Sequence, residues 1–291
     1  MSEQVPATPQ PAPAARFARP RTMHRFTARR VTVTDIAEIE RFTRVTLSSD
    51  ELGDWASTGP GDHARVFFPD PETGELLAPA PVGPEESGIV RPDGPAFGRD
   101  FTPLNVREDA GSGHRVFDLD ILRHSAPGPA ARWAARAELG DEVVVVGPRG
   151  SVSVASGAPR VLCVVDETAL PATARWIEDM PVSARLEVVA DVADGLDWVR
   201  AYLAAQGGRD VPVSAPPTGP AGLADAVREA GVGADTYVFA AGEATRLIPL
   251  RRLLRYELEL PREQYAITGY WKRGAAAFDH HAPIDPEDPE D

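Results

Sequence analysis

The segment Arg99-Asp100-Phe101-Thr102 brings a cation, an aromatic ring and a hydroxyl together within four consecutive residues. Arginine presents several fixed donors to a pyrophosphate. In an extended strand Phe101 lies on the same face as Arg99, where its ring can stack on a flat ligand. The Thr102 hydroxyl can hydrogen-bond that ligand ring or a polyol chain attached to it. These groups predict a binding site for a flavin dinucleotide, which carries all three of those features.

A glycine-bounded helix start follows at Gly128-Pro129-Ala130-Ala131. Proline is favoured at the first helical position because the N–H that it lacks would have no partner there. The free N–H groups at the start of a helix attract phosphate. This helix start therefore predicts the phosphate end of the same flavin site.

Short strand-like runs position these motifs between Phe26 and Ser151. Each run is apolar or alternating and is bounded by Gly, Pro or Asp. The runs are Arg30–Thr34, Arg41–Leu47, Ala64–Phe68, Val116–Leu122 and Glu142–Val146. Because only one helix, Pro129–Glu138, interrupts them, the pattern predicts a small antiparallel β-barrel.

After Ser151 the pattern changes to strands that alternate with helices. The expected strands are 161–165, 185–190, 235–241 and 264–268, and the expected helices are 169–180, 221–230 and 247–258. This alternation predicts a doubly wound parallel sheet. A ligand of such a sheet is expected beyond the C-terminal ends of its strands.

Length and charge limit the class of protein. A chain of 291 residues suits two domains of ordinary size. Its net charge of −14 argues against nucleic acid or an anionic membrane surface as the main partner. Six acidic residues and no Lys or Arg follow Gly274, so the rest of the chain carries only −8 and can still form a basic patch.

The sequence offers little for metal chemistry. The one cysteine, Cys163, lies in an apolar run and is expected to be a buried strand thiol, which excludes a disulfide or a cysteine-based cluster. His280 and His281 stand in an acidic, proline-rich segment, and we expect them to be solvated rather than to bind a metal. No apolar stretch is long enough for a membrane span and no secretory signal is visible, so we expect a cytoplasmic protein.

Seven short motifs occur in order over residues 25–275. They are His63–Pro69, Arg99–Thr102, His124 with Gly128–Trp133, Gly147–Ser151, Asp166–Ala172 with Trp176, Ala241–Glu243 ahead of Leu250–Leu254, and Gly269–Gly274. In these motifs the chain resembles the siderophore-interacting proteins, FAD-dependent ferric-siderophore reductases of the ferredoxin-reductase superfamily. The resemblance implies a flavin-binding barrel followed by a nucleotide-binding-like α/β domain.

The resemblance also implies roles for individual residues. Arg99 would contact FAD phosphate, Phe101 would stack on the flavin, and Thr102 would lie near its redox-active edge. The residues that it implies for cofactor binding are Arg99, Asp100, Phe101, Thr102, His124, Gly128, Ala130, Ala131, Trp133, Ser151, Asp166, Thr168, Gly242, Glu243 and Trp271. Lys272 and Arg273 would offer positive charge to an anionic iron chelate.

The chain departs from the family pattern at two of these places. Phe101 replaces the usual Tyr, so the stacking ring is kept and the phenol is lost. Where wider relatives carry a glycine-rich turn, this chain has Asp166-Glu167-Thr168, whose carboxylates would repel a phosphate. We therefore expect either NAD(P)H, bound weakly, or reduced ferredoxin as the electron donor.

These observations divide the chain into a disordered tail (1–24), an FAD-binding β-barrel (25–152), an NAD(P)H-binding-like α/β domain with a substrate-facing end (153–275) and an acidic tail (276–291). The function implied is FAD-dependent reduction of a ferric siderophore, in which the protein supplies no catalytic side chain and no metal ligand. Two alternatives stay open. One is an NAD(P)H-dependent reductase of flavin or small acceptors, and the other is a binding protein for flavin or iron chelate without turnover.

Overall fold

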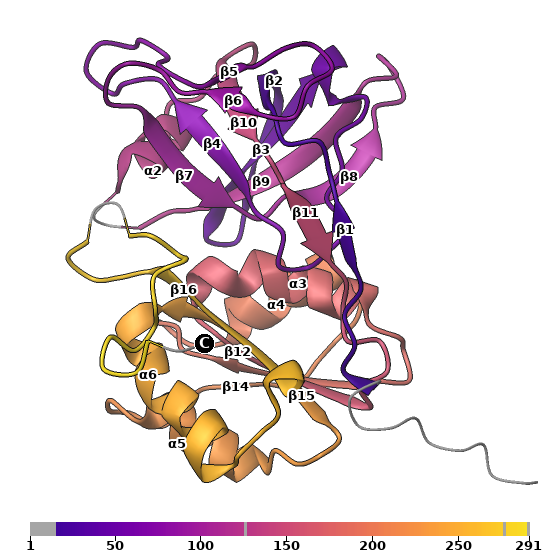
Figure 1. The fold of residues 1–291 in the computed structure, drawn as a ribbon, viewed down its shortest axis with the longest axis vertical. Helices are drawn as coiled ribbons and strands as arrows, with labels where there is room; N and C mark the ends of the chain where they lie inside the picture. Colours follow the sequence, from indigo (N-terminus) through magenta and orange to yellow (C-terminus); the bar gives the residue numbers. More distant parts are fainter. Residues whose placement is uncertain (1–15, 125–126, 276–277, 290–291) are drawn as a thin grey trace, which may run out of the picture.

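In the computed structural model, which describes residues 16–124, 127–275 and 278–289, an antiparallel sheet lies above a parallel sheet flanked by helices (Figure 1). The antiparallel sheet has the strand order β7-β4-β10-β2-β3-β9-β8. Its strands are β2 (Ala28–Ile39), β3 (Phe42–Ser49), β4 (Ala64–Phe68), β7 (Phe97–Phe101), β8 (Leu104–Glu108), β9 (Arg115–Leu122) and β10 (Glu142–Val146). Two small ribbons accompany it, β1 (Arg21–Met23) with β11 (Gly150–Val152), and β5 (Ala80–Pro81) with β6 (Ile89–Val90).

Alternation along the strands explains why both faces of this sheet are covered. On β10, Val143 and Val145 point into the main core, whereas Val144 and Val146 pack in a smaller cluster on the other face. The short helix α2 (Pro129–Ala134) covers one side of the main core, where the Trp133 ring lies 4.9 Å from that of Phe68.

The parallel sheet has the order β14-β13-β12-β15-β16, and every pairing in it is parallel. Its strands are β12 (Arg160–Val165), β13 (Arg185–Ala190), β14 (Val213–Ser214), β15 (Thr236–Glu243) and β16 (Tyr265–Trp271). Its helices are α3 (Leu170–Asp179), α4 (Asp197–Gly207), α5 (Gly222–Ala230) and α6 (Ala244–Arg252). Short 3-10 turns lie at Asp50–Leu52, Glu167–Ala169 and Arg262–Gln264, and a π turn at Leu253–Glu257 extends α6.

Successive residues of β12 pack on opposite sides of the parallel sheet. Val161, Cys163 and Val165 join the cluster that contains α3 and α4, while Leu162 and Val164 join the cluster that contains α5 and α6. The helices α3 and α4 lie between the two sheets (Figure 1). The predicted fold class, an antiparallel domain followed by a doubly wound parallel domain, is confirmed.

The structure departs from the sequence predictions in individual segments. The helix α4, which follows the positive-φ residues Asp194 and Gly195, was not among the expected helices. Residues 16–24 are not a disordered tail, since Phe17 is 4% exposed and β1 pairs with β11; residues 1–15 lie outside the described part of the chain. The described part of the acidic tail is likewise ordered.

Residues 278–289, which we name the C-terminal strap, pack against α6. Ile284 is buried in the α5–α6 cluster. Asp285 pairs with Arg252 at 2.6 Å, and Asp288 pairs with Arg251 at 2.5 Å. The acidic residues of the strap therefore neutralise an arginine cluster on α6. No helix within the described ranges is long and apolar enough to cross a membrane.

Candidate functional site

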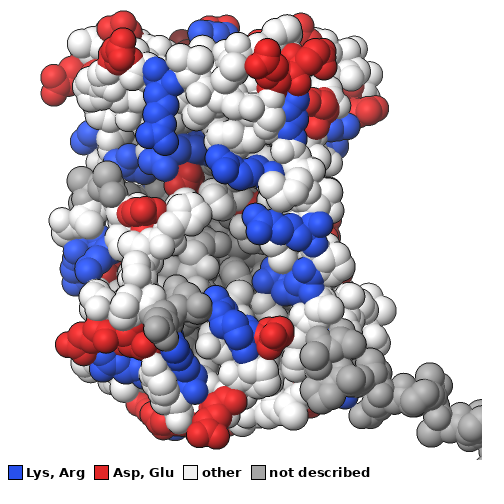
Figure 2. Space-filling view, in the orientation of Figure 1, with Lys and Arg blue, Asp and Glu red and all other residues white. Residues whose placement is uncertain are grey.

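A cavity of about 700 Å³ lies between the two sheets, a volume typical of ligand sites. The antiparallel domain contributes β7, the end of β9 and the start of α2 to its walls. The parallel domain contributes Thr168, β16 and, from the C-terminal strap, His280, His281, Ala282 and Ile284. Lys and Arg side chains gather around the hollow between the domains, whereas Asp and Glu concentrate toward the outer ends (Figure 2).

All four residues of the Arg99–Thr102 motif line this cavity. Strand alternation separates Arg99 and Phe101 from Asp100, which pairs with Arg65 on the neighbouring strand β4 at 3.4 Å. The Phe101 ring is half-buried and meets Phe68 edge-on at 6.0 Å. Thr102 is 9% exposed, directly after β7 ends.

The charges around Arg99 favour an anionic ligand. Loss of water in the cavity lowers the pKa of Arg99, and repulsion from Arg65 lowers it further. A bound phosphate would offset both effects, because it would supply the opposite charge in a partly dehydrated place. A cation, an aromatic ring and a hydroxyl thus lie along one wall of a cavity of suitable size, and these residues fit a flavin dinucleotide.

The residues around α2 divide into two groups. His124, Gly128, Ala130 and Ala131 line the cavity. Gly128 has φ −73° and open space where a Cβ would stand, so backbone geometry does not require glycine there. Trp133 does not line the cavity; it packs in the core instead.

Ser151 lies outside the cavity wall and holds a loop in place. Its hydroxyl donates to Asp62 at 2.6 Å and accepts from the backbone N–H of Thr58 at 3.0 Å. Asp62 also accepts from Ser57 at 3.0 Å, and Asp62 itself lines the cavity. Ser151 therefore acts on the cavity through Asp62.

Asp166 lies at the C-terminal end of β12 and is 7% exposed. Its carboxylate accepts from the N–H and hydroxyl of Thr168, at 2.9 and 2.6 Å, from Glu243 N–H at 2.9 Å and from Trp271 Nε1 at 2.8 Å. Burial raises the pKa of Asp166 to about 6. This carboxylate organises three strand ends and does not face the cavity, where only Thr168 and Trp271 of the group are found.

Gly242 and Glu243 belong to the same buried group. Gly242 has φ +150°, and a Cβ there would stand 2.6 Å from Asp166 Oδ2, so only glycine fits. Glu243 caps α6 by accepting from Arg246 N–H at 2.8 Å, and it also accepts from Arg273 N–H at 3.1 Å. Neither residue lines the cavity.

The predicted substrate residues Lys272 and Arg273 are exposed and lie outside the cavity wall. Trp271, 37% exposed, is the last residue of β16 to reach the cavity. Arg21 on β1 is exposed and does line the cavity, a position that the sequence analysis missed because it assigned residues 1–24 to a disordered tail.

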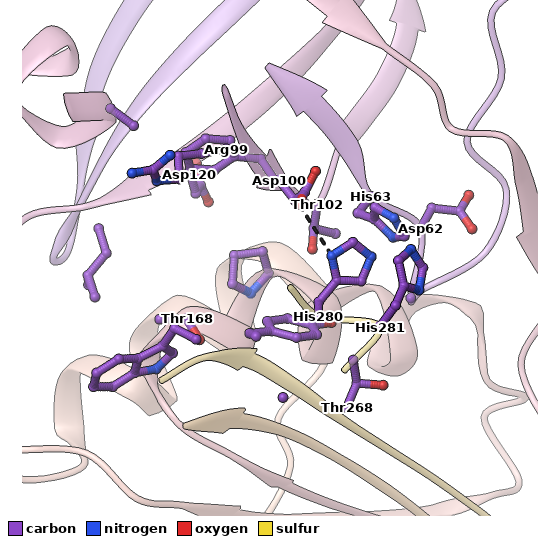
Figure 3. A pocket seen from close by; sticks show the side chains of 18 of the residues that line it. Asp62, His63, Arg99, Asp100, Thr102, Asp120, Thr168, Thr268, His280 and His281 are labelled. Atoms are coloured by element: carbon purple, nitrogen blue, oxygen red, sulfur yellow. Dashed lines mark ion pairs between the residues drawn. The ribbon is translucent and has the colours of Figure 1, made fainter. Parts of the chain in front are cut away.

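Three histidines meet at the cavity in a way that was not predicted from the sequence. His63, His280 and His281 line one side of the cavity, near Asp100 and Thr102 (Figure 3). His280 Nδ1 lies 3.4 Å from Asp100 Oδ2. Removal from water lowers the pKa of His63, and His280 lowers it further. His281 is exposed, as expected, whereas His280 is only partly exposed, because the strap is held on α6 by contacts that the local sequence does not reveal.

Comparisons with known proteins match both domains. A family model described as the siderophore-interacting FAD-binding domain matches residues 29–152, and one described as siderophore-interacting protein matches residues 158–274. Ferric vibriobactin reductase ViuB of Vibrio cholerae is 28% identical over 250 residues, which cover 82% of this chain and 86% of that protein. The NADPH-dependent ferric-chelate reductase of Escherichia coli is 35% identical over 156 residues, which cover 52% of this chain and 57% of that protein.

Solved structures agree with these matches. A siderophore utilization protein from T. fusca is 33% identical with a TM-score of 0.75, covering 91% of this chain and all of that one. The siderophore-interacting protein SipS from Aeromonas hydrophila is 26% identical with a TM-score of 0.65, covering 86% of this chain and 93% of that one.

Proposed function

The chain belongs to the siderophore-interacting protein family, and from that membership we propose that it is an FAD-dependent reductase of ferric siderophores. The observation that carries the proposal is the placement of Arg99, Phe101 and Thr102 along the wall of a cavity between the domains. FAD bound there supplies electrons one at a time to ferric iron, which stays wrapped in its own chelator.

The residues of this chain bind and orient the reactants. Arg99 would bind the phosphates of FAD, and Phe101 with Thr102 would bind its ring. Fe(III) prefers hard oxygen ligands, so its reduction to Fe(II) weakens the chelate and releases iron. The electron transfer moves no proton to the substrate, and the reaction therefore needs no general acid or base from the protein.

NAD(P)H is the proposed electron donor, and it approaches at the C-terminal edge of the parallel sheet, where Thr168 and Trp271 meet the cavity. The E. coli relative is NADPH-dependent. The buried carboxylate of Asp166 is turned away from this approach, which weakens the expectation that it repels a phosphate. Reduced ferredoxin is the alternative donor. A cytoplasmic place of action follows from the use of NAD(P)H.

The anionic chelate is proposed to bind beside Arg21, which is exposed at the cavity wall. The basic surroundings of the hollow would attract such a chelate. Lys272 and Arg273 lie outside the wall, and this placement favours the second candidate, an NAD(P)H-dependent flavin or small-acceptor reductase without a siderophore site.

An anaerobic visible spectrum separates these functions. The purified protein with FAD receives NADH, NADPH or reduced ferredoxin, and then a ferric siderophore with a ferrous-specific dye. Flavin bleaching that the chelate reverses, with colour from the dye, is the expected result and identifies the donor. Bleaching that no ferric chelate reverses would favour the general flavin reductase, and flavin that no donor bleaches would favour a binding protein.

Two substitutions locate the reactants within the same assay. Arg99→Ala should weaken FAD binding by roughly 10- to 150-fold, because it removes a charge-assisted contact of about 1.5–3 kcal/mol. Arg30→Ala is the matched control, since Arg30 is exposed and pairs with Glu142 on β10. Arg21→Ala should raise the KM for the chelate and leave FAD binding unchanged. An unchanged FAD affinity in Arg99→Ala would contradict the proposed site.

A further inference from the structure

Three imidazole rings from two distant parts of the chain meet at one side of the cavity. His63 precedes β4, and His280 and His281 belong to the C-terminal strap. The ring centroids of His63 and His280 are 4.5 Å apart, and those of His280 and His281 are 4.0 Å apart (Figure 3). The ring of His63 lies 6.4 Å from that of His281.

A carboxylate joins this group. Asp279, His280 and His281 each offer one ligand atom, and these atoms lie within 4.8 Å of one another. The Asp279 side chain also accepts from the backbone N–H of His281 at 2.9 Å, which fixes the turn that brings both residues to the same side. Imidazole and carboxylate together are a donor set for divalent transition metals.

His280 is oriented as metal-bound histidines are. Its Nδ1 faces the carboxylate of Asp100 at 3.4 Å, while its Nε2 is buried and has no hydrogen-bond partner among the described residues. A ligating histidine ordinarily gives its other ring nitrogen to a carboxylate, which fixes the tautomer and the direction of the lone pair. An unpartnered buried nitrogen is costly unless something binds it.

We propose that Asp279, His280 and His281, with His63 beside them, form a binding site for a divalent transition-metal ion, and that during turnover this site receives the Fe(II) released by reduction. The second part rests on the proposed function. The Fe(II) formed by one-electron reduction of the chelated Fe(III) would exchange chelator oxygens, which take up protons from water, for neutral imidazole nitrogens, with no further electron transferred. Imidazole nitrogens bind Fe(II) well, whereas the chelator oxygens bind Fe(III) more strongly than Fe(II). Reduction therefore shifts the preference of the ion from the chelator toward the histidines.

Anaerobic titration of the FAD-loaded protein with Co²⁺ tests the site without turnover. The wild type should bind one Co²⁺ and develop visible ligand-field bands beyond the flavin absorption. The double variant His280→Ala/His281→Ala should lose this binding. His114→Ala, which removes an exposed histidine between β8 and β9, is the matched control and should bind as the wild type does. Equal binding by the double variant, or none by the wild type, would overturn the proposal.

A second variant separates positioning from folding. Asp100→Asn should keep the fold and weaken Co²⁺ binding by about 10- to 100-fold, the usual effect of a lost carboxylate behind a histidine ligand. Its FAD content is measured in parallel from the flavin spectrum. Unchanged Co²⁺ affinity in this variant would contradict the assigned role of Asp100.

The role in turnover is tested with Fe(II) and a ferric chelate. After one turnover, the wild type should retain part of the Fe(II) through gel filtration under anaerobic conditions, and the double variant should release it all. Flavin reoxidation by the chelate, measured in the same run, reports the proposed function separately. Reoxidation without retained iron would overturn the product role, whereas Co²⁺ binding without reoxidation would overturn the proposed function and leave the metal site standing.

Discussion

The phenol of Tyr202 on α4 donates a 2.7 Å hydrogen bond to Asp120 on β9, and this bond joins the two domains at the cavity wall. Arg44 on β3 binds the same carboxylate with two nitrogens, each at 2.7 Å, and reaches Gln206 on α4 as well. Burial and the charge of Asp120 raise the pKa of Tyr202, so the phenol remains a donor. A buried polar contact between the domains therefore holds Asp120 at the cavity wall.

Tyr202→Phe should lower the free energy of unfolding by about 1.5–3 kcal/mol, because it removes a buried hydrogen bond to a charged group. Urea unfolding monitored by tryptophan fluorescence measures the change. Tyr256→Phe serves as the control, since Tyr256 is 53% exposed and its bond to Asp288 is open to water. If both substitutions lowered the unfolding free energy equally, the buried Tyr202–Asp120 bond would stabilise the protein no more than an exposed one.

Gly128→Ala tests whether glycine is needed for the ligand rather than for the backbone. The position has φ −73° and free space for a Cβ, so alanine should leave stability unchanged or raise it by about 0.4–1 kcal/mol. If FAD phosphate approaches Gly128 closely, the FAD affinity should fall by at least about tenfold, or ~1.4 kcal/mol. Flavin fluorescence titration measures this affinity.

Gly242→Ala, unlike Gly128→Ala, should destabilise the folded protein. Its Cβ would clash with the buried Asp166, and its φ of +150° is unfavourable for alanine. We therefore expect a lower melting temperature. Unchanged FAD affinity in Gly128→Ala would show that the phosphates are held elsewhere.

Local patterns in the sequence predicted most of the fold. Strand alternation is a property of neighbouring residues, and it identified β3, β4, β9 and β10. In the parallel sheet the sequence pattern predicted β12, β13, β15 and β16, whereas the two-residue strand β14 was not predicted. The helix α4 was missed because its stability comes from packing Val199 and Tyr202 on the sheet, a tertiary effect that its own periodicity shows weakly. The same limit applies to β1, whose partner β11 is distant in the chain.

The site was predictable where its residues are consecutive. Arg99–Thr102 lies at the cavity because the end of β7 and the residue directly after it bring all four side chains to the same wall. His63 and His280 meet only because the strap folds back over α6, and the acid–arginine pairs that hold it there could not be matched from sequence. The negative charge of the strap was read as a sign of solvation, although it is paired.

Asp166 should make stability depend on pH in a defined window. Its pKa is raised from 3.8 to about 6 in the folded protein, so the native state binds the proton more tightly than the unfolded chain. This contribution to stability is fully present below pH 3.8 and is lost as the pH rises through about 6. The difference of about two pKa units corresponds to about 3 kcal/mol.

Asp166→Asn removes this titration. As the pH rises across that window, the unfolding free energy of the wild type should fall by about 3 kcal/mol because of Asp166, and that of the variant should not show this fall. The amide of the variant also loses hydrogen bonds that the carboxylate accepted, but this loss of stability is the same at every pH and does not change the pH dependence. Urea unfolding of both proteins across the window measures it, and parallel pH profiles would contradict the raised pKa.

Ile284→Asp should detach the C-terminal strap and thereby separate the metal site from the flavin site. Ile284 is 6% exposed in the α5–α6 cluster, and burial of such a side chain contributes about 1.5–3 kcal/mol. Loss of that energy lowers the equilibrium constant for docking of the strap by roughly 10- to 150-fold. Co²⁺ affinity should fall with the docked fraction, because only the docked strap places His280 and His281 at the cavity wall.

The strap residues His280, His281, Ala282 and Ile284 also line the cavity, so the flavin content of Ile284→Asp is measured in parallel and Co²⁺ affinity is compared at equal flavin occupancy. Val182→Asp is the control, because it adds the same charge at a side chain that is 93% exposed. Hydrogen exchange should rise at residues 278–289 in Ile284→Asp alone. If exchange rises there while Co²⁺ affinity is unchanged, the metal is held without the strap, and His280 and His281 are not its ligands.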